Sequence, residues 1–217
     1  MTTRRRTICC ILSAALLSSC AAVGPEPRHR VVRVKALASP GLRERNPRWP
    51  EEVRGLVEAA SDYYEREFGI RLITESAAAW PGEPVASTLE LLSRLKREFS
   101  PRKSAGRYDI VIAFTAEAGS RYFRSGRPRV DRIGNCREGL GRYVVAPVTE
   151  PFRYTGIRDE PKYDVAVLIH ELGHVFGAEH VDDPSSVMHE RFEYRSEFDM
   201  KNRNVILKNR ECPFADE

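Results

Sequence analysis

The most constraining feature of this 217-residue chain is residues 170–180, which read HELGHVFGAEH. His170 and His174 stand four residues apart, so on a helix their side chains lie on one face. Their ring nitrogens can then bind one zinc ion at about 2.0–2.1 Å. Gly177 favours the left-handed conformation that ends helices, and the turn after it brings His180 to the same ion. Three protein ligands leave one coordination position open, which is typical of a catalytic zinc site.

Glu171 is the residue of this motif that we expect to transfer protons. It follows His170 directly but is offset around the helix axis, so it need not bind the metal. Zinc lowers the pKa of a bound water to about 7 and polarises a carbonyl group. We expect Glu171 to act as the general base for this zinc-activated water and then to give the proton to a leaving amine. The segment therefore predicts zinc-dependent hydrolysis.

The helix that carries these residues is expected to be buried. Its other positions are largely apolar: Val165, Ala166, Val167, Leu168, Ile169, Leu172, Val175 and Phe176. Histidine and glutamate are costly to bury without a partner, so an accidental HExxH on a solvated helix surface explains the pattern poorly.

An alternative zinc site would take Glu193, from a following helix, in place of His180. We favour His180, because Gly177 already supplies the turn that delivers it. Residues 182–184, Asp-Asp-Pro, also indicate a turn and not a spacer helix.

The motif HExxHxxGxxH resembles the signature of the metzincin zinc peptidases. Metzincins also place a methionine in a tight turn beneath the zinc, and Ser-Ser-Val-Met at residues 185–188 lies where that turn is expected. The Asp-Pro pair after His180, with Met188 eight residues after that histidine, is most similar to the matrixin branch. The resemblance implies an α+β zincin fold with a mixed twisted sheet, a zinc-binding helix, a Met-turn and a C-terminal helix. It also implies one catalytic Zn²⁺, Met188 as the hydrophobic floor of the site, and a peptide or protein substrate bound in extended form.

The chain departs from matrixins beside the expected site. Val181 replaces the usual serine after the third histidine, and His189-Glu190 replace Tyr-Pro after the methionine. These residues border the pocket for the substrate side chain that follows the cleaved bond, so the resemblance implies no cleavage preference. Some metzincins place a transition-state tyrosine two residues after the methionine. Glu190 stands there, and Tyr194 is a weak substitute.

The N-terminus resembles a bacterial lipoprotein signal peptide. Arg4, Arg5 and Arg6 precede an apolar stretch, residues 8–17, that is too short to span a bilayer as a stable helix. Leu-Ser-Ser-Cys then resembles a lipobox, in which Cys20 is lipidated and becomes the first residue of the mature protein. The alternative is a plain secretory signal cut nearby, for example after Ala21.

These features divide the chain into a signal (1–19), a lipidated cysteine with a short tether (20–30) and a single catalytic domain (31–217). Two or more acyl chains would anchor the protein stably outside the cytoplasm. By resemblance to enterobacterial lipoprotein sorting, Ala21 after the cysteine favours the outer membrane or cell surface. The alternative location is a secreted or periplasmic soluble protein.

The net charge limits the binding partners that we expect, and the number of cysteines limits the possible disulfides. The net charge is +4, and three of these charges leave with the signal, so the mature chain is near +1. We therefore expect no nucleic-acid partner, and we expect a monomer. Of the five cysteines, Cys136 and Cys212 remain after removal of the signal and lipidation of Cys20. An exported protein permits a disulfide between them, and two separate thiols are the alternative.

The hydrophobic pattern predicts the order of elements. We expect strands at 31–37, 70–73, 108–114, 130–136 and 142–148, and helices at 50–68, 87–99, 163–177 and 198–209. Ser87 and Glu90 form a capping-box pattern at the second of these helices. Residues 115–129 form a basic loop that we expect to be a solvated surface. By the resemblance, an edge strand pairs with the extended substrate, and residues 130–136 are the candidate.

Three functions compete. The leading hypothesis is a lipid-anchored zinc metalloendopeptidase with Glu171 as general base. The second is a non-proteolytic zinc-binding scaffold lipoprotein of the same fold, which would have no use for Glu171. The third is a non-peptide hydrolase with the same zinc. Only His29 precedes the motif, so a second, structural zinc is unsupported, and the cysteine latency motif of matrixins is missing. The sequence does not indicate whether calcium is required.

Overall fold

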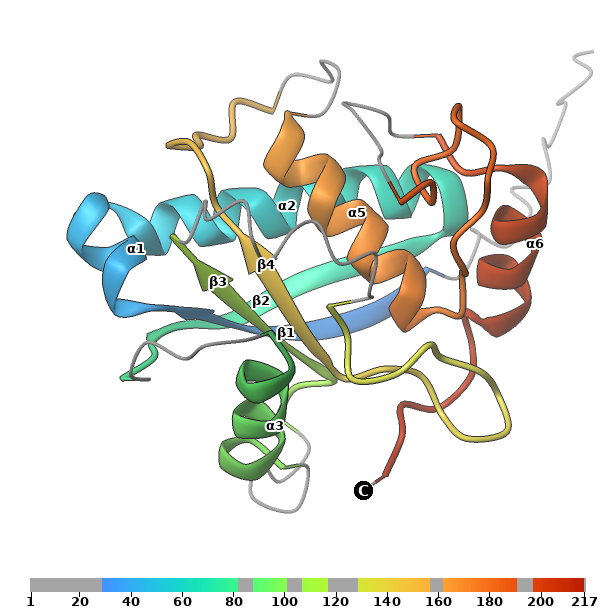
Figure 1. The fold of residues 1–217 in the computed structure, drawn as a ribbon, viewed down its shortest axis with the longest axis horizontal. Coiled ribbons are helices and arrows are strands. Elements are labelled where there is room, and N and C mark those ends of the chain that lie inside the picture. Colours follow the sequence, from blue (N-terminus) through green and yellow to red (C-terminus); the bar gives the residue numbers. More distant parts are fainter. Residues whose placement is uncertain are drawn as a thin grey trace, which may run out of the picture.

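The computed structural model describes residues 29–81, 88–100, 107–116, 129–156, 162–190 and 197–216. In chain order its elements are β1 (Arg30–Ala38), α1 (Pro40–Arg45), α2 (Trp49–Phe68), β2 (Ile70–Ala79), α3 (Thr88–Glu98), β3 (Ile110–Thr115), β4 (Tyr143–Pro147), α5 (Tyr163–Val175) and α6 (Met200–Asn209). The four strands form one parallel sheet in the order β2-β1-β3-β4. Helices α2 and α5 lie on one face of this sheet and α3 lies on the other (Figure 1).

The β1-α2-β2 unit builds one edge of the sheet. Val32, Val34 and Ala36 alternate with more exposed residues of β1 and belong to the same buried core as α2. Pro50 occupies the first turn of α2, where its missing N–H costs no helical hydrogen bond. Gly69 ends the helix with a φ of 66°, and β2 begins at the next residue.

Hydrophobic cores cover both faces of the sheet. The larger core lies between the sheet and helices α2 and α5, and Tyr64 donates its hydroxyl to the carbonyl oxygen of Ile169 at 2.9 Å. The smaller core joins α3 to the opposite face and contains Leu37, Trp80 and Leu95. Helix α5 therefore contacts both the sheet and the neighbouring helix α2, and both fix its position.

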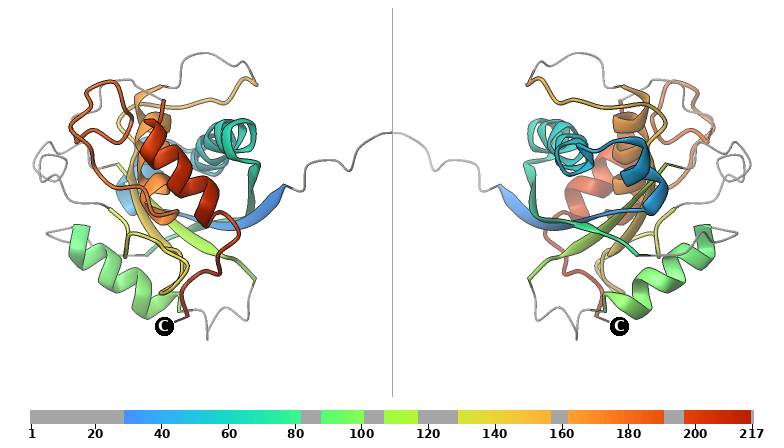
Figure 2. Two further views of the ribbon diagram at one scale, coloured as in Figure 1. Left: turned by 90° about the vertical axis from the view of Figure 1, so that its right-hand side faces the viewer. Right: turned by 90° about the vertical axis from the view of Figure 1, so that its left-hand side faces the viewer.

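The C-terminal segment closes the molecule beside the end of α5. Helix α6 lies next to α5 (Figure 2). After α6, a disulfide joins Cys212 to Cys136 across 76 residues. The N–H of Leu140 donates to Pro213 at 2.9 Å, and the N–H of Ala215 donates to Leu140 at 3.0 Å. These contacts attach the chain end to the loop that precedes β4, and the two cysteines are bonded and not separate thiols.

The α+β architecture expected from the sequence is confirmed, but several local expectations need correction. Strand β2 continues to Ala79 and does not end at residue 73. The zinc helix ends at Val175 and not at residue 177, and helix α1 was not expected. The sheet is parallel in all its described strands, and antiparallel pairing is limited there to isolated bridges such as that of Val130 with Val144.

The expected strand at residues 130–136 is wrong. Only residues 129–131 lie beside β4, and the chain then turns under the end of α5, where Gly134 donates its N–H to His174 at 2.9 Å. The side chain of Asn135 accepts the N–H groups of Arg137 and Glu138 and closes a turn. The segment's β-forming side chains suggested a strand, but the backbone N–H of Gly134 caps the end of α5.

The signal, the lipobox with Cys20, and Ser87 of the expected capping box all lie outside the described residues. Within the described ranges, no helix combines the length and the apolar character needed to cross a membrane.

Candidate metal centre

Helix α5 positions the first two histidines. His170 and His174 are buried, with exposed fractions of 3% and 0%. The start of the helix is tied to the end of β4, because Asp164 accepts the N–H of Thr149 at 2.9 Å and its hydroxyl at 2.8 Å. The helix thus enters the core at a fixed point and presents both imidazoles to one side.

Gly177 turns the chain after α5, as its position in the motif predicts. Its φ is 100°, a conformation that other residues rarely adopt. A Cβ at this position would come within 2.5 Å of both the Asn209 amide nitrogen and the Gly134 carbonyl oxygen. The turn is therefore both left-handed and tightly enclosed, and only glycine fits it.

Two asparagines of α6, which sequence reasoning missed, hold this turn. Asn209 donates its side-chain amide to the carbonyl oxygen of Phe176 at 3.0 Å. Asn202 accepts the N–H of Glu179 at 2.9 Å and donates to the carbonyl oxygen of the same residue at 2.9 Å. The backbone of Glu179, the residue before His180, is thus held through both its N–H and its carbonyl oxygen. The sequence gives no sign of this role for Asn202 and Asn209, because their backbone partners lie 23 and 33 residues away, after the end of α5.

The structure brings His170, His174 and His180 together through their Nε2 atoms. The three Nε2–Nε2 distances are each 3.2 Å. An ideal tetrahedron with edges of this length has its corners about 2.0 Å from its centre, which is the length of a zinc–imidazole bond. The three side chains form the cluster of metal-binding groups found among the described residues.

The hydrogen bonds of the His170 and His174 imidazole rings indicate a protonation state that is suited to zinc binding. Nδ1 of His170 lies 2.6 Å from the carbonyl oxygen of Val187, and Nδ1 of His174 lies 2.7 Å from that of Ala178. A carbonyl can only accept, so each Nδ1 carries the hydrogen and each Nε2 presents a lone pair. Burial lowers the pKa of His170 well below its usual value and that of His174 to about 4. Converging lone pairs on neutral rings repel one another unless a cation lies between them, so the residues present fit a zinc ion.

Met188, the expected floor of the site, packs against helix α5. It is fully buried, and a Cβ on Gly173 would come within 2.9 Å of its sulfur, so the thioether packs directly against the α5 backbone. The hydroxyl of Ser186 accepts the N–H of Met188 at 3.1 Å and donates to Asp199, the N-cap of α6, at 2.8 Å. Ser186 therefore connects residues 186–188 to the start of α6.

Glu171 is buried beside the cluster, with 3% of its surface exposed. Burial raises its pKa to about 7, against the opposing charge and hydrogen bond of Arg129. Its Oε2 accepts the backbone N–H of Arg129 at 2.8 Å, and Oε1 lies 3.7 Å from Nη1 of the same residue. A carboxylate at this position can exchange a proton near neutral pH.

Arg129 corrects the expectation of a solvated loop at residues 115–129. Only 13% of its side chain is exposed, and it faces Glu171. Residues 117–128 lie outside the described residues. The sequence offered no signal for Arg129 beyond its place in a basic stretch.

Glu190 lies at the rim of the site and not within it. Its side chain is 59% exposed, and Oε1 stands 3.8 Å from Nδ1 of His180. A cavity of about 320 Å³ adjoins this rim and is lined by His180, Val181, Asp182, His189 and Glu190. Glu193 and Tyr194, the alternative ligand and the substitute tyrosine, lie outside the described residues.

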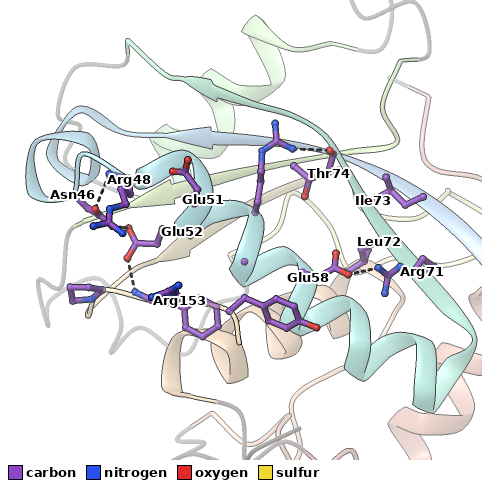
Figure 3. A pocket seen from close by; sticks show the side chains of 15 residues that line it. Asn46, Arg48, Glu51, Glu52, Glu58, Arg71, Leu72, Ile73, Thr74 and Arg153 are labelled. Atoms are coloured by element: carbon purple, nitrogen blue, oxygen red, sulfur yellow. Dashed lines mark hydrogen bonds and ion pairs between the residues drawn. The ribbon is translucent and has the colours of Figure 1, made fainter. Parts of the chain in front are cut away.

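A second cavity, of about 1000 Å³, lies between α2, β2 and the segment after β4 (Figure 3). Its charged groups largely pair with their surroundings: Glu52 accepts the N–H of Phe152 at 2.8 Å, and Arg54 donates to the carbonyl oxygen of Thr74 at 3.2 Å. None of its lining residues belongs to the histidine cluster. This cavity is therefore separate from the histidine cluster at α5.

Sequence comparison agrees with the geometry of this site. The model of Metallo-peptidase family M12 matches residues 28–216, nearly the whole chain. The chain belongs to metallopeptidase family M12. The three-histidine cluster of this family member is accordingly a binding site for one Zn²⁺. At this general level the chain is a zinc metallopeptidase.

Solved structures show the same fold for this M12 family member. Archaemetzincin from Methanopyrus kandleri matches with a TM-score of 0.54 and 20% identity, over 86% of this chain and 98% of that one. A structure described as a chaperone–substrate complex matches with a TM-score of 0.54 and 11% identity, over 84% of this chain and 35% of that one. No curated protein sequence matches the chain significantly. Identities this low establish the shared fold alone.

Proposed function

We propose that this metallopeptidase is an endopeptidase that uses Glu171 as its general base. The observation that carries the proposal is the Nε2 triangle of His170, His174 and His180, with edges of 3.2 Å, beside the buried carboxylate of Glu171. A scaffold would need the histidines alone. A buried carboxylate is costly, and it is explained by a need to accept and return a proton.

Zinc, when bound by the three histidines, would polarise the substrate carbonyl and acidify the attacking water. Glu171 accepts the proton of that water at its carboxylate and then donates it to the amide nitrogen as the peptide bond breaks. The carbonyl oxygens of Val187 and Ala178 keep the rings of His170 and His174 oriented throughout. The apolar surroundings of α5 exclude bulk water from the proton transfer.

The substrate is proposed to lie extended beside residues 129–131. The carbonyl oxygen of Arg129 accepts from Val145 at 2.9 Å, and the N–H of Asp131 donates to Tyr143 at 3.1 Å. In an antiparallel pair this pattern directs the N–H and C=O of the intervening Val130 away from β4. An extended peptide can pair with these outward groups, next to Glu171.

The remaining features of this proposal come from the sequence. We place the protein outside the cytoplasm, anchored through lipid on Cys20, as a monomer. Within the metallopeptidases, we assign residues 180–188 to the matrixin pattern, although His189 and Glu190 depart from it.

The test is cleavage of an unstructured protein by the zinc-loaded enzyme, with the Glu171→Gln variant as the control. We expect cleavage by the parent, loss of cleavage in the variant, and one zinc bound per chain in both. Zinc binding without cleavage in the parent would favour the scaffold lipoprotein. Equal cleavage by parent and variant would remove Glu171 from the mechanism, and hydrolysis of esters or other amides without peptides would favour the third hypothesis.

A further inference from the structure

Arg129 connects the edge of the sheet to the carboxylate of Glu171. Its carbonyl oxygen accepts the N–H of Val145 on β4, and the bridge between Val130 and Val144 follows directly. Antiparallel pairing would then send the N–H of Arg129 to the carbonyl oxygen of Val145. The N–H goes instead to Oε2 of Glu171, at 2.8 Å. The ladder is thus interrupted at the residue that meets the proposed general base.

The guanidinium of Arg129 approaches the other oxygen of the same carboxylate. Nη1 lies 3.7 Å from Oε1, and 13% of the arginine side chain is exposed against 4% for the glutamate. Burying a guanidinium is costly unless it serves a nearby anion, and Glu171 is that anion. Backbone and side chain of one residue therefore bracket both oxygens of Glu171.

The two contacts differ in kind. Oε2 is engaged at hydrogen-bond distance, whereas 3.7 Å to Oε1 exceeds that distance. Oε1 therefore keeps its capacity to accept a proton, and its direction is set by the contact on Oε2 and the nearby positive charge.

We propose that Arg129 is a positioning residue for the reaction, which orients the Glu171 carboxylate so that Oε1 faces the attacking water. This inference rests on the proposed function. It also means that one residue serves two tasks, because Arg129 belongs to the segment beside which the extended peptide is proposed to lie. Binding of the substrate main chain and orientation of the base are thereby coupled.

The kinetic test compares Arg129→Met and Arg129→Lys with Arg137→Met, an exposed arginine of the same loop. We expect Arg129→Met to lower kcat roughly 10²-fold, the scale of loss when a reacting group is misplaced by about 1 Å. KM and zinc affinity, measured by chelator competition, should stay near those of the parent. Arg129→Lys should recover part of the loss, added guanidinium ion should raise the kcat of Arg129→Met, and Arg137→Met should match the parent.

Two further measurements separate positioning from a general structural role. In the Glu171→Gln background, Arg129→Met should cause no further loss of residual turnover, because its effect passes through Glu171. In thermal unfolding of the metal-free protein, Arg129→Met should lower the midpoint, and the double variant should recover part of the decrease, because the unpaired buried carboxylate is gone. Additive effects in either cycle would overturn the inference.

Three other outcomes are also decisive. A rise in kcat for Arg129→Met would show that the arginine obstructs Glu171, which contradicts positioning. A parent enzyme that binds zinc but cleaves no peptide would overturn the proposed function and this role with it. A cleaving parent with an unaffected Arg129→Met variant would overturn the positioning role alone.

Discussion

Asn202 forms two hydrogen bonds with the backbone of Glu179, accepting its N–H and donating to its carbonyl oxygen, both at 2.9 Å. Asn202 is 1% exposed, and Glu179 immediately precedes the third zinc ligand, His180. A side chain of α6 thus replaces the secondary-structure partners that an irregular segment lacks. The position of His180 depends on this pair as much as on the motif that contains it.

Asn202→Ala should therefore weaken both folding and zinc binding. A hydrogen bond contributes about 0.5–1.5 kcal/mol net, and the backbone of the exposed residue Glu179 loses two of them. We expect the free energy of unfolding in urea to fall by roughly 1–3 kcal/mol and the zinc affinity to fall with it. Asn204→Ala, at an exposed position of the same helix, is the control. Unchanged zinc affinity in a destabilised Asn202→Ala variant would contradict the link to His180.

Gly177→Ala should disrupt the turn that delivers His180. Its φ of 100° is strained for alanine, and the new Cβ would stand 2.5 Å from the Gly134 carbonyl oxygen. Backbone strain alone costs about 1–3 kcal/mol, and the clash adds to it. Gly156→Ala is a matched control, since its φ is 72° but no atom lies within 4 Å of the added Cβ. Urea unfolding should rank Gly177→Ala well below Gly156→Ala, and equal losses would assign the whole effect to φ.

Removal of zinc should destabilise the protein measurably. A ligand present at 1,000 times its Kd stabilises the folded state by about 4.1 kcal/mol. We expect chelation to lower the thermal midpoint, and His174→Ala to abolish the response to zinc. Glu171→Gln should keep the response, because Glu171 is not a ligand in this arrangement. A zinc-dependent midpoint that survives in His174→Ala would place the ion elsewhere.

Asp199→Ala should destabilise the protein in a pH-dependent way. Burial tends to raise the pKa of Asp199, but hydrogen bonds from Asn202 and Ser186 outweigh it, so the pKa lies below its ordinary value. A lowered carboxylate pKa contributes stability above the ordinary value near 3.8, and this is lost as the pH falls through the folded-state pKa. Loss of the N-cap should cost about 1 kcal/mol at pH 7.

The difference between the parent and Asp199→Ala in urea unfolding should therefore shrink below about pH 4. Asp216→Ala, at an exposed position near the C-terminus, serves as the control. A difference that is the same at pH 3 and pH 7 would assign the effect to packing and not to the charged cap.

The zinc ligands could be predicted from the sequence because their geometry is local. His170 and His174 are related by helix spacing, and Gly177 signals a turn through its own backbone freedom. Arg129 and Asn202 could not be predicted in this way. Arg129 lies 42 residues from Glu171 in sequence, and Asn202 lies 23 from Glu179, so only the packed fold brings them together.

Residues 130–136 illustrate the opposite error. Val130 and Ile133 favour a strand by their side chains, but Gly134 must approach so closely that a Cβ would stand 2.0 Å from the Val175 carbonyl oxygen. The carbonyl groups at the end of α5 need hydrogen-bond donors, and this need outweighs the strand propensity of residues 130–136. A sequence pattern indicates the conformation that a segment prefers by itself, but not the hydrogen bonds that distant segments require of it in the fold.

The end of α5 also bears on when the site can form. The carbonyl oxygens of His174, Val175 and Phe176 are capped by Gly134, by Gly141 and by the side chain of Asn209, the last of which follows Phe176 by 33 residues. A chain that emerges N-terminus first contains the HExxH motif long before it contains this last partner. The end of α5 thus gains its full set of hydrogen-bond partners only after α6 has been synthesised, and chains interrupted between the motif and α6 would carry the HExxH motif without the amide of Asn209 that caps Phe176.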